Sequence, residues 1–213
     1  MEFYLKTVSQ IGLIFYQGAT KPDFLGIELT DGKIRLLLNK GNGPTELIHD
    51  KNVNDGKWHR VIFEFNFNIS SFVSIKIDEN EKKLALPTGN KYLDLSKPLY
   101  VGGVELNKRA KAISKGFKSK DISFKGCIKN MILDKIDMGL PDVKISQGIV
   151  TNCVWGYPCA DTQPCIPGAI CSQLGIKSFT CDCEQSLCIK NNYTDDYKVN
   201  FFIFYFIYII KYL

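Results

Sequence analysis

The feature that most constrains how this chain of 213 residues can fold is a set of short runs in which apolar and polar residues alternate. Two of these runs, 25–30 and 34–39, lie on either side of the dipeptide Asp31-Gly32. Alternation with a period of two is typical of a strand with one buried face, and a two-residue Asp-Gly connection between two such runs favours a β-hairpin. The sequence therefore predicts an antiparallel hairpin over 25–39.

The longest run follows a second Asp-Gly turn. Residues 54–65 read N-D-G-K-W-H-R-V-I-F-E-F, and the alternation places His59, Val61, Phe63 and Phe65 on one face. Shorter extended runs are expected at 5–7, 12–16, 45–48, 73–77, 84–86, 92–95, 98–103 and 124–133. Short strands separated by Gly, Asn and Asp turns, with almost no helical periodicity, predict an all-β fold, an antiparallel sandwich or jelly roll.

Four motifs resemble the laminin G, neurexin and sex-hormone-globulin family of β-sandwich domains. They are F-x-L-K-T-x4-G-L-I-F-Y at 3–16, N-D-G-K-W-H-R-V at 54–61, Y-V-G-G at 100–103 and F-x-G-C-I at 124–128. The resemblance implies a concanavalin-like jelly roll over residues 1–153. It also implies that the first motif is the second or third strand of such a domain, so that the first strand or two are missing.

The cysteines are concentrated near the end of the chain, where six of the eight lie between 159 and 188. Such density predicts a disulfide-stapled module of about thirty residues, because so short a segment cannot fold on its apolar core alone. The even number of cysteines favours an oxidising compartment and hence an extracellular protein. A zinc site is disfavoured because no C-x2-C pair is present.

These six cysteines, with Phe179-Thr180 before a C-x-C, resemble an epidermal-growth-factor-like (EGF-like) module at 154–190. Spacing alone leaves fifteen connectivities open. The resemblance implies that Cys159 pairs with Cys171, Cys165 with Cys181 and Cys183 with Cys188. In the laminin G family the cysteine of the F-x-G-C-I motif pairs with one near the end of the domain, which implies a bond between Cys127 and Cys153.

A calcium site is the main binding hypothesis. Composition alone would make Asp23 and Asp94 ordinary turn residues, but they stand where laminin G and neurexin domains carry the two carboxylates that bind Ca²⁺. The resemblance implies further carbonyl ligands from Lys40 and Tyr92. We expect one weak calcium ion at the rim of the sandwich, with an affinity of about 10⁻⁴ to 10⁻³ M as in extracellular modules.

The formal charge of +5 has a local origin in a basic loop at 107–120. A positive field of this kind could attract sulfated glycans, and the alternative is a solvated loop. Nucleic acid is disfavoured, because the loop has few aromatic residues and the cysteines indicate an extracellular protein. The candidate glycan-binding residues are Lys108, Arg109, Lys111, Lys115, Lys118 and Lys120.

Enzymatic function is not expected. The two histidines, His49 and His59, lack a catalytic companion motif, and His59 is better explained as a packed or hydrogen-bonded strand residue. The competing class is a sugar-active jelly-roll enzyme, which needs a pair of carboxylates on one sheet face. Glu28 and Glu64 lie on predicted strands, where we expect solvated outward side chains that do not form a pair.

The chain begins without a secretory signal, so we expect it to be part of a longer extracellular adhesion or matrix protein that binds a protein receptor or a sulfated glycan. Residues 191–213 form a linker and apolar tail. The run 201–213 is short of the roughly 20 residues of a membrane helix, and is either a truncated span or a gene-model artefact. Asn68 and Asn192 stand in glycosylation sequons.

Overall fold

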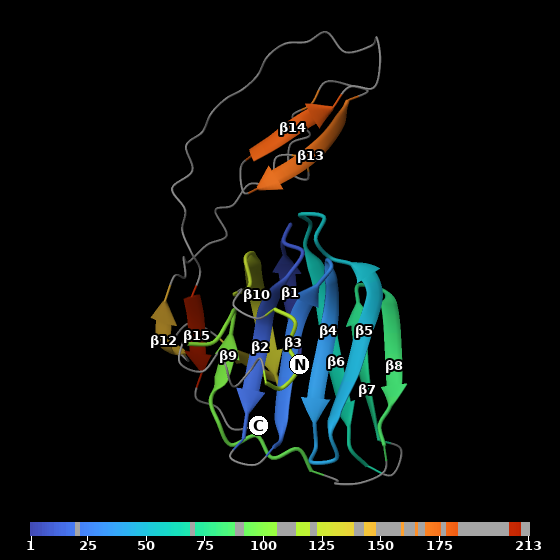
Figure 1. Ribbon diagram of the computed structural model, residues 1–213, viewed down its shortest axis with the longest axis vertical. Helices are drawn as coiled ribbons and strands as arrows, with labels where there is room; N and C mark the ends of the chain where they lie inside the picture. The colour runs from blue at the N-terminus through green and yellow to red at the C-terminus, as the bar shows by residue number, and fades with distance from the viewer. Residues whose placement is uncertain are drawn as a thin grey trace.

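The computed structural model describes a β-sandwich and a separate two-stranded hairpin. Figure 1 shows the sandwich as two sheets stacked face to face, with β2, β3, β4 and β5 in front of β1, β6 and β7. Among the described residues no helix is long and apolar enough to span a bilayer. The structure describes residues 1–19, 22–68, 71–87, 92–105, 114–119, 123–138, 143–147, 159, 165, 169–175, 178–182 and 205–209.

One layer is a six-stranded sheet with the strand order β11-β10-β1-β6-β7-β8. Its neighbours are all antiparallel, as the alternating runs predict. The long run at 54–65 supplies a central strand, with Phe3 of β1 opposite Val61 and Ile77 of β7 on the other side. The strands are β1 (Glu2–Lys6), β6 (His59–Asn66), β7 (Phe72–Ile77), β8 (Asn80–Ala85), β10 (Cys127–Leu133) and β11 (Ile136–Met138).

The other layer is a seven-stranded sheet with the order β12-β15-β9-β2-β3-β4-β5. The predicted hairpin is present as β3 and β4, with Thr30 opposite Lys33 across the turn and Asp31 and Gly32 both at positive φ. Five residues of the tail form β15, and three of them, Ile207, Tyr208 and Ile209, pair with β9. The strands are β2 (Gly12–Gly18), β3 (Phe24–Thr30), β4 (Lys33–Asn39), β5 (Pro44–Asn52), β9 (Leu99–Val101), β12 (Val143–Gln147) and β15 (Tyr205–Ile209).

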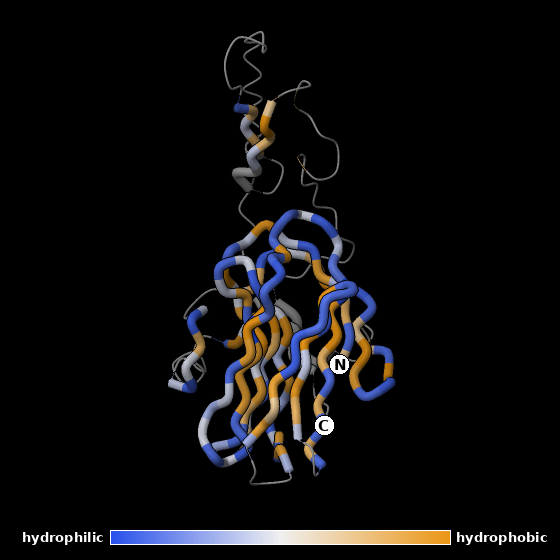
Figure 2. The backbone as a smooth tube through the Cα atoms, turned by 90° about the vertical axis from the view of Figure 1, so that its right-hand side faces the viewer, coloured by the Kyte–Doolittle hydropathy of each residue, from blue (hydrophilic) through white to orange (hydrophobic). Residues whose placement is uncertain are grey.

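The main core lies between the two sheets. Phe3, Phe15 and Phe63 form its aromatic centre, with the Phe3 centroid 4.8 Å from that of Phe15 and 6.1 Å from that of Phe63. Because these rings come from three strands of both sheets, their packing joins the layers. Figure 2 shows hydrophobic residues along the strands and hydrophilic residues in many of the loops. Other fully buried core side chains are Leu5, Ile14, Ile27, Leu29, Ile34, Leu36 and Leu38.

A β-bulge in β2 changes which residues face the core. The register of β2 against β3 shifts between Leu13 and Phe15, so Ile14 and Phe15 both belong to the main core. Leu13 and Tyr16 then face outward, into a second apolar cluster on the outer side of the seven-stranded sheet. A bulge is the usual way for a strand to present two consecutive side chains to one face.

The second cluster makes β2, β3 and β4 more buried than alternation predicts. Every residue of β2 and β3 is buried, whereas β6 has the expected pattern of buried and exposed positions. The cluster contains Leu13, Tyr16, Phe24, Leu37, Tyr100, Val104 and Phe117.

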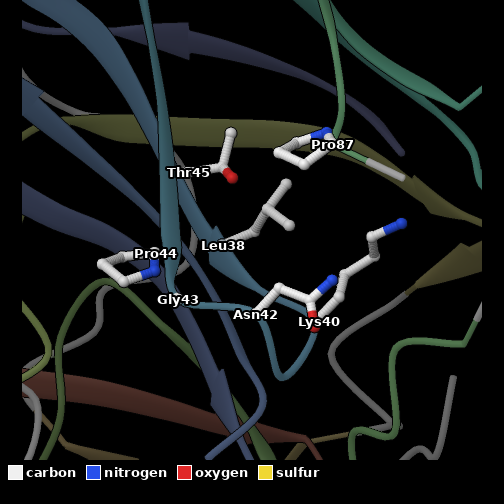
Figure 3. A pocket seen from close by; sticks show the side chains of 7 residues that line it. All are labelled: Leu38, Lys40, Asn42, Gly43, Pro44, Thr45 and Pro87. Carbon is white, nitrogen blue, oxygen red and sulfur yellow. The ribbon is translucent and has the colours of Figure 1, made fainter. Parts of the chain in front are cut away.

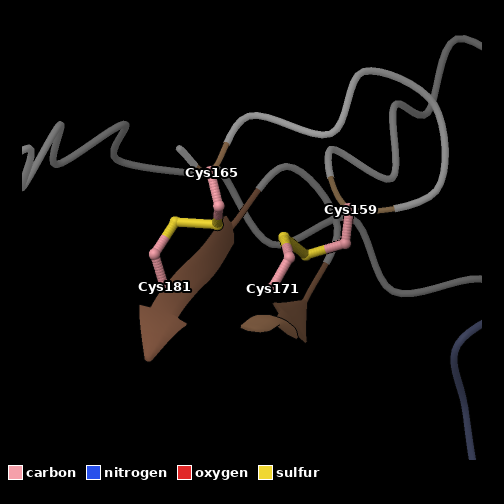
Figure 4. Close-up of a disulfide and its surroundings, with 4 residues drawn as sticks. All are labelled: Cys159, Cys165, Cys171 and Cys181. Atoms are coloured by element: carbon pink, nitrogen blue, oxygen red, sulfur yellow. A yellow bond between two sulfur atoms is a disulfide. The ribbon is translucent and has the colours of Figure 1, made fainter. Parts of the chain in front are cut away.

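The third sheet is the hairpin of β13 (Ile170–Gly175) and β14 (Ser178–Asp182). Two disulfides bind it to the preceding segment, Cys159–Cys171 and Cys165–Cys181, with Cα–Cα distances of 5.6 and 5.7 Å (Figure 4). These are two of the three pairs that the EGF-like resemblance implies. The third pair, Cys183 with Cys188, lies outside the described residues.

Candidate functional site

The candidate calcium residues lie where β3 begins and β4 ends. Phe24 pairs with Asn39, so the next positions of this antiparallel ladder are Asp23 and Lys40. Asp23 is two positions from Leu25, and Lys40 is two positions from Leu38, so each shares the face of a core residue. Both are buried, with 6% of each residue exposed. The register therefore brings the carboxylate and the Lys40 backbone to one corner of the sandwich.

Asp94 reaches the same corner from a distant part of the chain. Its backbone N–H donates a hydrogen bond of 3.1 Å to Oδ2 of Asp23, although 71 positions separate the two residues. Asp94 is exposed, and Tyr92, two positions before it, is 75% exposed. Of the residues that the resemblance assigns to a metal site, Asp23 and Asp94 are thus in contact, and Lys40 follows the Asn39 partner of Phe24 at the same end of the ladder.

The turn between β4 and β5 is shaped by Asn39. Its Oδ1 accepts hydrogen bonds from the backbone N–H groups of Gly41 and Gly43, at 2.7 and 3.2 Å. Both glycines have positive φ, a conformation that glycine adopts at little cost. This turn fixes Lys40 at the rim and borders a pocket of about 90 Å³, which Figure 3 shows. The pocket is lined by Leu38, Lys40, Asn42, Gly43, Pro44, Thr45 and Pro87.

The chemistry of the corner suits a hard cation. Calcium prefers six to eight oxygen ligands, which carboxylates and backbone carbonyls supply together with water. At this corner Asp23 and Asp94 could supply carboxylates, and the backbone at Lys40 and Tyr92 could supply carbonyl oxygens. Among the described residues no group of three or more His, Cys, Asp or Glu side chains is arranged to hold a metal ion, so the corner would be a two-carboxylate site.

Part of the basic loop is packed rather than solvated. Residues 114–119, called the strap below, lie on the outer face of the seven-stranded sheet, with Phe117 only 4% exposed. The Phe117 ring meets Tyr16 edge-on at a centroid distance of 5.7 Å and lies 5.9 Å from Phe24. A Cβ atom at Gly26 would overlap this ring, so β3 requires glycine where the strap crosses it.

The six basic residues proposed for glycan binding are therefore not all equivalent. Lys118 is exposed, whereas Lys115 is half-buried and donates a hydrogen bond of 3.3 Å to the Pro22 carbonyl. The other four, Lys108, Arg109, Lys111 and Lys120, lie outside the described residues.

Glu28 of β3 binds the strap through hydrogen bonds to its backbone. The expectation of a solvated side chain at this position is wrong. The Glu28 side chain is fully buried and accepts hydrogen bonds from the backbone N–H groups of Lys118 and Ser119, the latter at 2.8 Å. It also accepts from the Ser119 hydroxyl and forms an ion pair with Arg35. A buried carboxylate is stable only when it is paired and hydrogen-bonded, and this one is.

Arg35 completes the cluster on the adjacent strand. It binds Glu28 and Glu46 and donates a hydrogen bond of 3.1 Å to the Gly116 carbonyl. Although burial of the guanidinium opposes its charge, hydrogen bonds to Glu28 and Glu46 raise the pKa of Arg35. The sequence signal for this cluster was Glu28 on β3 directly opposite Arg35 on β4, a register that follows from the predicted hairpin.

The two glutamates considered as a catalytic pair lie on opposite outer faces of the sandwich. Glu28 is between core residues Ile27 and Leu29 on β3, and Glu64 is between Phe63 and Phe65 on β6 of the other sheet. Since packed sheets are about 10 Å apart and both side chains point outward, the pair exceeds the separation that glycosidases use. This arrangement excludes Glu28 and Glu64 as the acid pair of a glycosidase.

His59 has the hydrogen-bonded role predicted for it. Its Nδ1 lies 2.8 Å from Oδ2 of Asp78 and its Nε2 lies 2.9 Å from Oδ1 of Asp55. Ionised carboxylates only accept hydrogen bonds, so in these contacts the ring nitrogens are the donors. Lys51 of β5 also binds Asp78, at 2.6 Å, and so links the two sheets.

The carboxylates around His59 are stabilised in their charged form. Burial opposes ionisation of Asp78, but hydrogen bonds from Lys51, His59 and the Arg60 amide lower its pKa from 3.8 to about 2. In Asp55 burial is likewise outweighed by bonds from the Lys57 amide and His59, and its pKa is lowered. These groups form a structural clasp, called the His59 clasp below.

The second histidine is also held by local contacts. His49 lies 3.1 Å from the Asn80 carbonyl through Nε2, and its Nδ1 accepts from the Lys51 amide at 3.0 Å. Burial lowers the pKa of His49. Of the sequons, Asn68 is exposed at the end of β6, and Asn192 lies outside the described residues. Cys127 is disulfide-bonded, while its expected partner Cys153 lies outside them as well.

The model of the family described as "Laminin G domain" matches residues 5–136. This match runs from the end of β1 to the start of β11 and includes the whole candidate rim, while β12 and β15 of the seven-stranded sheet lie outside it. This chain belongs to the laminin G domain family. The resemblance carried by the four sequence motifs is thereby confirmed.

Relatives of this laminin G domain include human laminin subunit alpha-1, which is 31% identical over 156 residues, 70% of this chain and 5% of that protein. Mouse neurexin-2 is 30% identical over 192 residues, 86% of this chain and 11% of that protein. Domains LG4-5 of the mouse laminin alpha1 chain share the fold with a TM-score of 0.57 at 24% identity, covering 64% of this chain and 35% of that one. The chain thus spans a small part of these relatives.

Proposed function

We propose that this laminin G domain is an extracellular adhesion or matrix module that binds a protein or glycan partner at a calcium-bearing rim. The observation that carries the proposal is the contact between Asp23 and Asp94, which places two carboxylate residues 71 positions apart at one corner. Membership of the family that includes laminin and neurexin chains supports an adhesion role and a location outside the cell.

Calcium would act at this rim as a bridge. Asp23 and Asp94 would each supply a carboxylate, the backbone at Lys40 and Tyr92 would add carbonyl oxygens, and open coordination positions would accept an oxygen of the partner. Asp23 is the residue fixed by its surroundings, being buried and next to the β3–β4 ladder, whereas exposed Asp94 can adapt to the ion. Two carboxylates with few further charges predict weak calcium binding, with a dissociation constant of about 10⁻⁴ to 10⁻³ M.

The test is calorimetric titration of the oxidised full chain with calcium up to about 10 mM, well above the dissociation constants of extracellular modules. The double variant Asp23→Asn, Asp94→Asn should lose the saturable heat. The variant Asp134→Asn, Asp137→Asn, which removes one carboxylate in the β10–β11 turn and one in β11, should retain it. The same heat in wild type and in the rim variant would eliminate the proposed site.

Glycan binding through the basic loop is a second candidate, and it can operate without calcium. It is favoured by the Lys115 contact with the Pro22 carbonyl, because that contact brings the basic loop to the calcium corner. A sulfated chain could then meet the loop and the rim at once. Heparin affinity should fall in Lys118→Gln, which removes an exposed charge, and stay unchanged in Lys83→Gln on β8. Equal elution salt for Lys118→Gln and wild type would exclude a role for this lysine.

The domain boundaries that we propose are a laminin G domain at 1–153, an EGF-like module at 154–190 and a further segment at 191–213. The two disulfides around the β13–β14 hairpin support a separate stapled module in the second region. Limited proteolysis of the oxidised chain should cut near the 153–154 boundary, and cleavage within β13 or β14 instead would contradict this division.

A further inference from the structure

The strap contacts the calcium corner on both sides of Asp23. The Lys115 ammonium donates to the carbonyl of Pro22, at 3.3 Å, and lies 5.3 Å from the centroid of the Phe24 ring. Pro22 and Phe24 are the chain neighbours of the candidate ligand. One lysine therefore touches the residue before Asp23 and the residue after it.

A second strap residue presses on the same segment. The Phe117 ring lies 5.9 Å from the Phe24 ring at an interplanar angle of 61° and covers Gly26 two positions further along β3. Both aromatic rings are almost completely buried, with 4% and 1% exposed. Well-packed buried rings leave little freedom for the backbone that carries them, so Phe117 limits movement of the start of β3.

The strap is itself anchored strongly enough to act in this way. Glu28 accepts two consecutive backbone N–H groups, those of Lys118 and Ser119, and Arg35 donates to the Gly116 carbonyl. Displacing the strap would leave a buried carboxylate with fewer partners, which is costly in a site closed to water. The buried polar cluster under the strap is thus the fixed point from which Lys115 and Phe117 reach the rim.

We propose that the strap is a positioning element of the rim: docking of residues 114–119 fixes Pro22–Phe24 and thereby holds Asp23 against Asp94. Strap docking and cation binding are then coupled, and the coupling is reciprocal, so calcium also stabilises the docked strap. The proposal rests on the proposed calcium function for its consequence. Its structural core, the dependence of the Asp23–Asp94 hydrogen bond on the strap, exists without any metal.

The first test needs no calcium. Amide hydrogen exchange of the oxidised full chain reports the Asp94 N–H, which donates to Asp23, and the Lys118 and Ser119 N–H groups, which donate to Glu28. The test variant is Phe117→Ala, Ser119→Ala, which removes the ring and one hydroxyl donor. The matched control is Phe72→Ala, Ser74→Ala on β7, which makes the same chemical changes on the other sheet.

In the test variant the Asp94 amide should exchange at least about fivefold faster than in wild type. A factor of about five is the lower end of the coupling usually found between two linked sites. In the control this amide should exchange at the rate of wild type after correction for any change in global stability. An unchanged Asp94 rate in the test variant would overturn the proposal. Because the measurement is made in metal-free buffer, this result is independent of whether the chain binds calcium.

The second test adds calcium to the same three proteins. The test variant should bind it about fivefold more weakly than wild type or the control, by the same coupling. Equal affinity in all three would overturn the coupling while leaving the calcium site intact. If wild type bound no calcium, the proposed function would fail, and the exchange experiment would still decide whether the strap positions Asp23.

Discussion

The two sheets of the sandwich are built from similar alternating strands, but their outer faces differ. The six-stranded sheet is open, and its strand β6 alternates between buried core residues and exposed Arg60 and Glu64. The seven-stranded sheet is closed by the strap, so that Glu28 on β3 is fully buried in an equivalent outward position. The comparison shows that an outward strand residue is not necessarily a solvent-exposed one.

The closed face is also the one next to the candidate calcium corner. Phe24 belongs to the apolar cluster under the strap, and Asp23 precedes it. A sheet that is packed on both sides holds a rim residue rigidly, whereas the outer face of the six-stranded sheet is exposed to solvent. The closed face therefore has a structural role, and the proposed binding site lies at its edge.

The largest predicted difference between the faces comes from matched glutamate substitutions. Glu28→Ala removes one of the two carboxylate partners of buried Arg35 and the acceptor of two strap amides, so it should cost about 3 to 5 kcal/mol of unfolding free energy. Glu64→Ala on the open face should change that free energy by no more than about 0.5 kcal/mol. Urea unfolding of the oxidised chain measures both. Equal effects would mean that the outer faces do not differ.

A smaller effect is expected at Gly26, where the strap crosses β3. In Gly26→Ala the new Cβ must displace the Phe117 ring, and overpacking of this kind costs about 1 to 3 kcal/mol. In a Phe117→Ala background the same substitution should cost much less, because the ring is gone. A double-mutant cycle by urea unfolding gives the coupling, and additive effects would show that Phe117 does not cover Gly26.

On the six-stranded sheet the testable contribution to stability comes from charged groups, those of the His59 clasp, and not from packing on the outer face. Asp78 has its pKa lowered from 3.8 to about 2, so its contribution to stability is present above about pH 3.8 and lost as the pH falls toward 2. Asp78→Asn retains a residue that tolerates the positive φ of this position but removes the charge. Its unfolding free energy should vary less over this range than that of wild type. Parallel pH profiles would contradict the His59 clasp as the source of the shift.

The smallest effect is expected for an ion pair that has no support from burial. Lys82 Nζ lies 2.8 Å from Oδ1 of Asp50, whose side chain is 82% exposed. Hydration and salt screening leave such pairs little net stability. Asp50→Asn should leave the urea midpoint unchanged within error. A loss of stability comparable to that of Glu28→Ala would show that the buried Glu28 cluster and this exposed ion pair do not differ in their contributions.

The sequence predicts most of the sandwich because local alternation and turn chemistry determine it. The hairpin of β3 and β4 and the inward face of β6 follow from Asp-Gly turns and a period of two. The bulge at Ile14 and the burial of Glu28 do not, since both depend on contacts with chain segments far away in sequence. Alternation reports which face a residue occupies, and only tertiary packing decides whether that face is covered.

The candidate site divides in the same way. Proximity of Asp23 to Lys40 follows from the predicted hairpin register, whereas Asp94 could be placed beside Asp23 only through family resemblance. The contact of Lys115 with Pro22 had no local signal, because a lysine in a basic loop gives no indication of its distant partner.

The most direct test of the calcium rim is a calcium titration followed at the Asp94 amide by two-dimensional NMR of the oxidised full chain. In the metal-free protein this N–H donates to Oδ2 of Asp23, so an ion bound by Asp23 must change its environment. We predict a saturable shift with a midpoint of about 0.1 to 1 mM that disappears in Asp23→Asn, Asp94→Asn. An Asp94 signal that does not move, or moves equally in that variant, would contradict calcium binding at this rim.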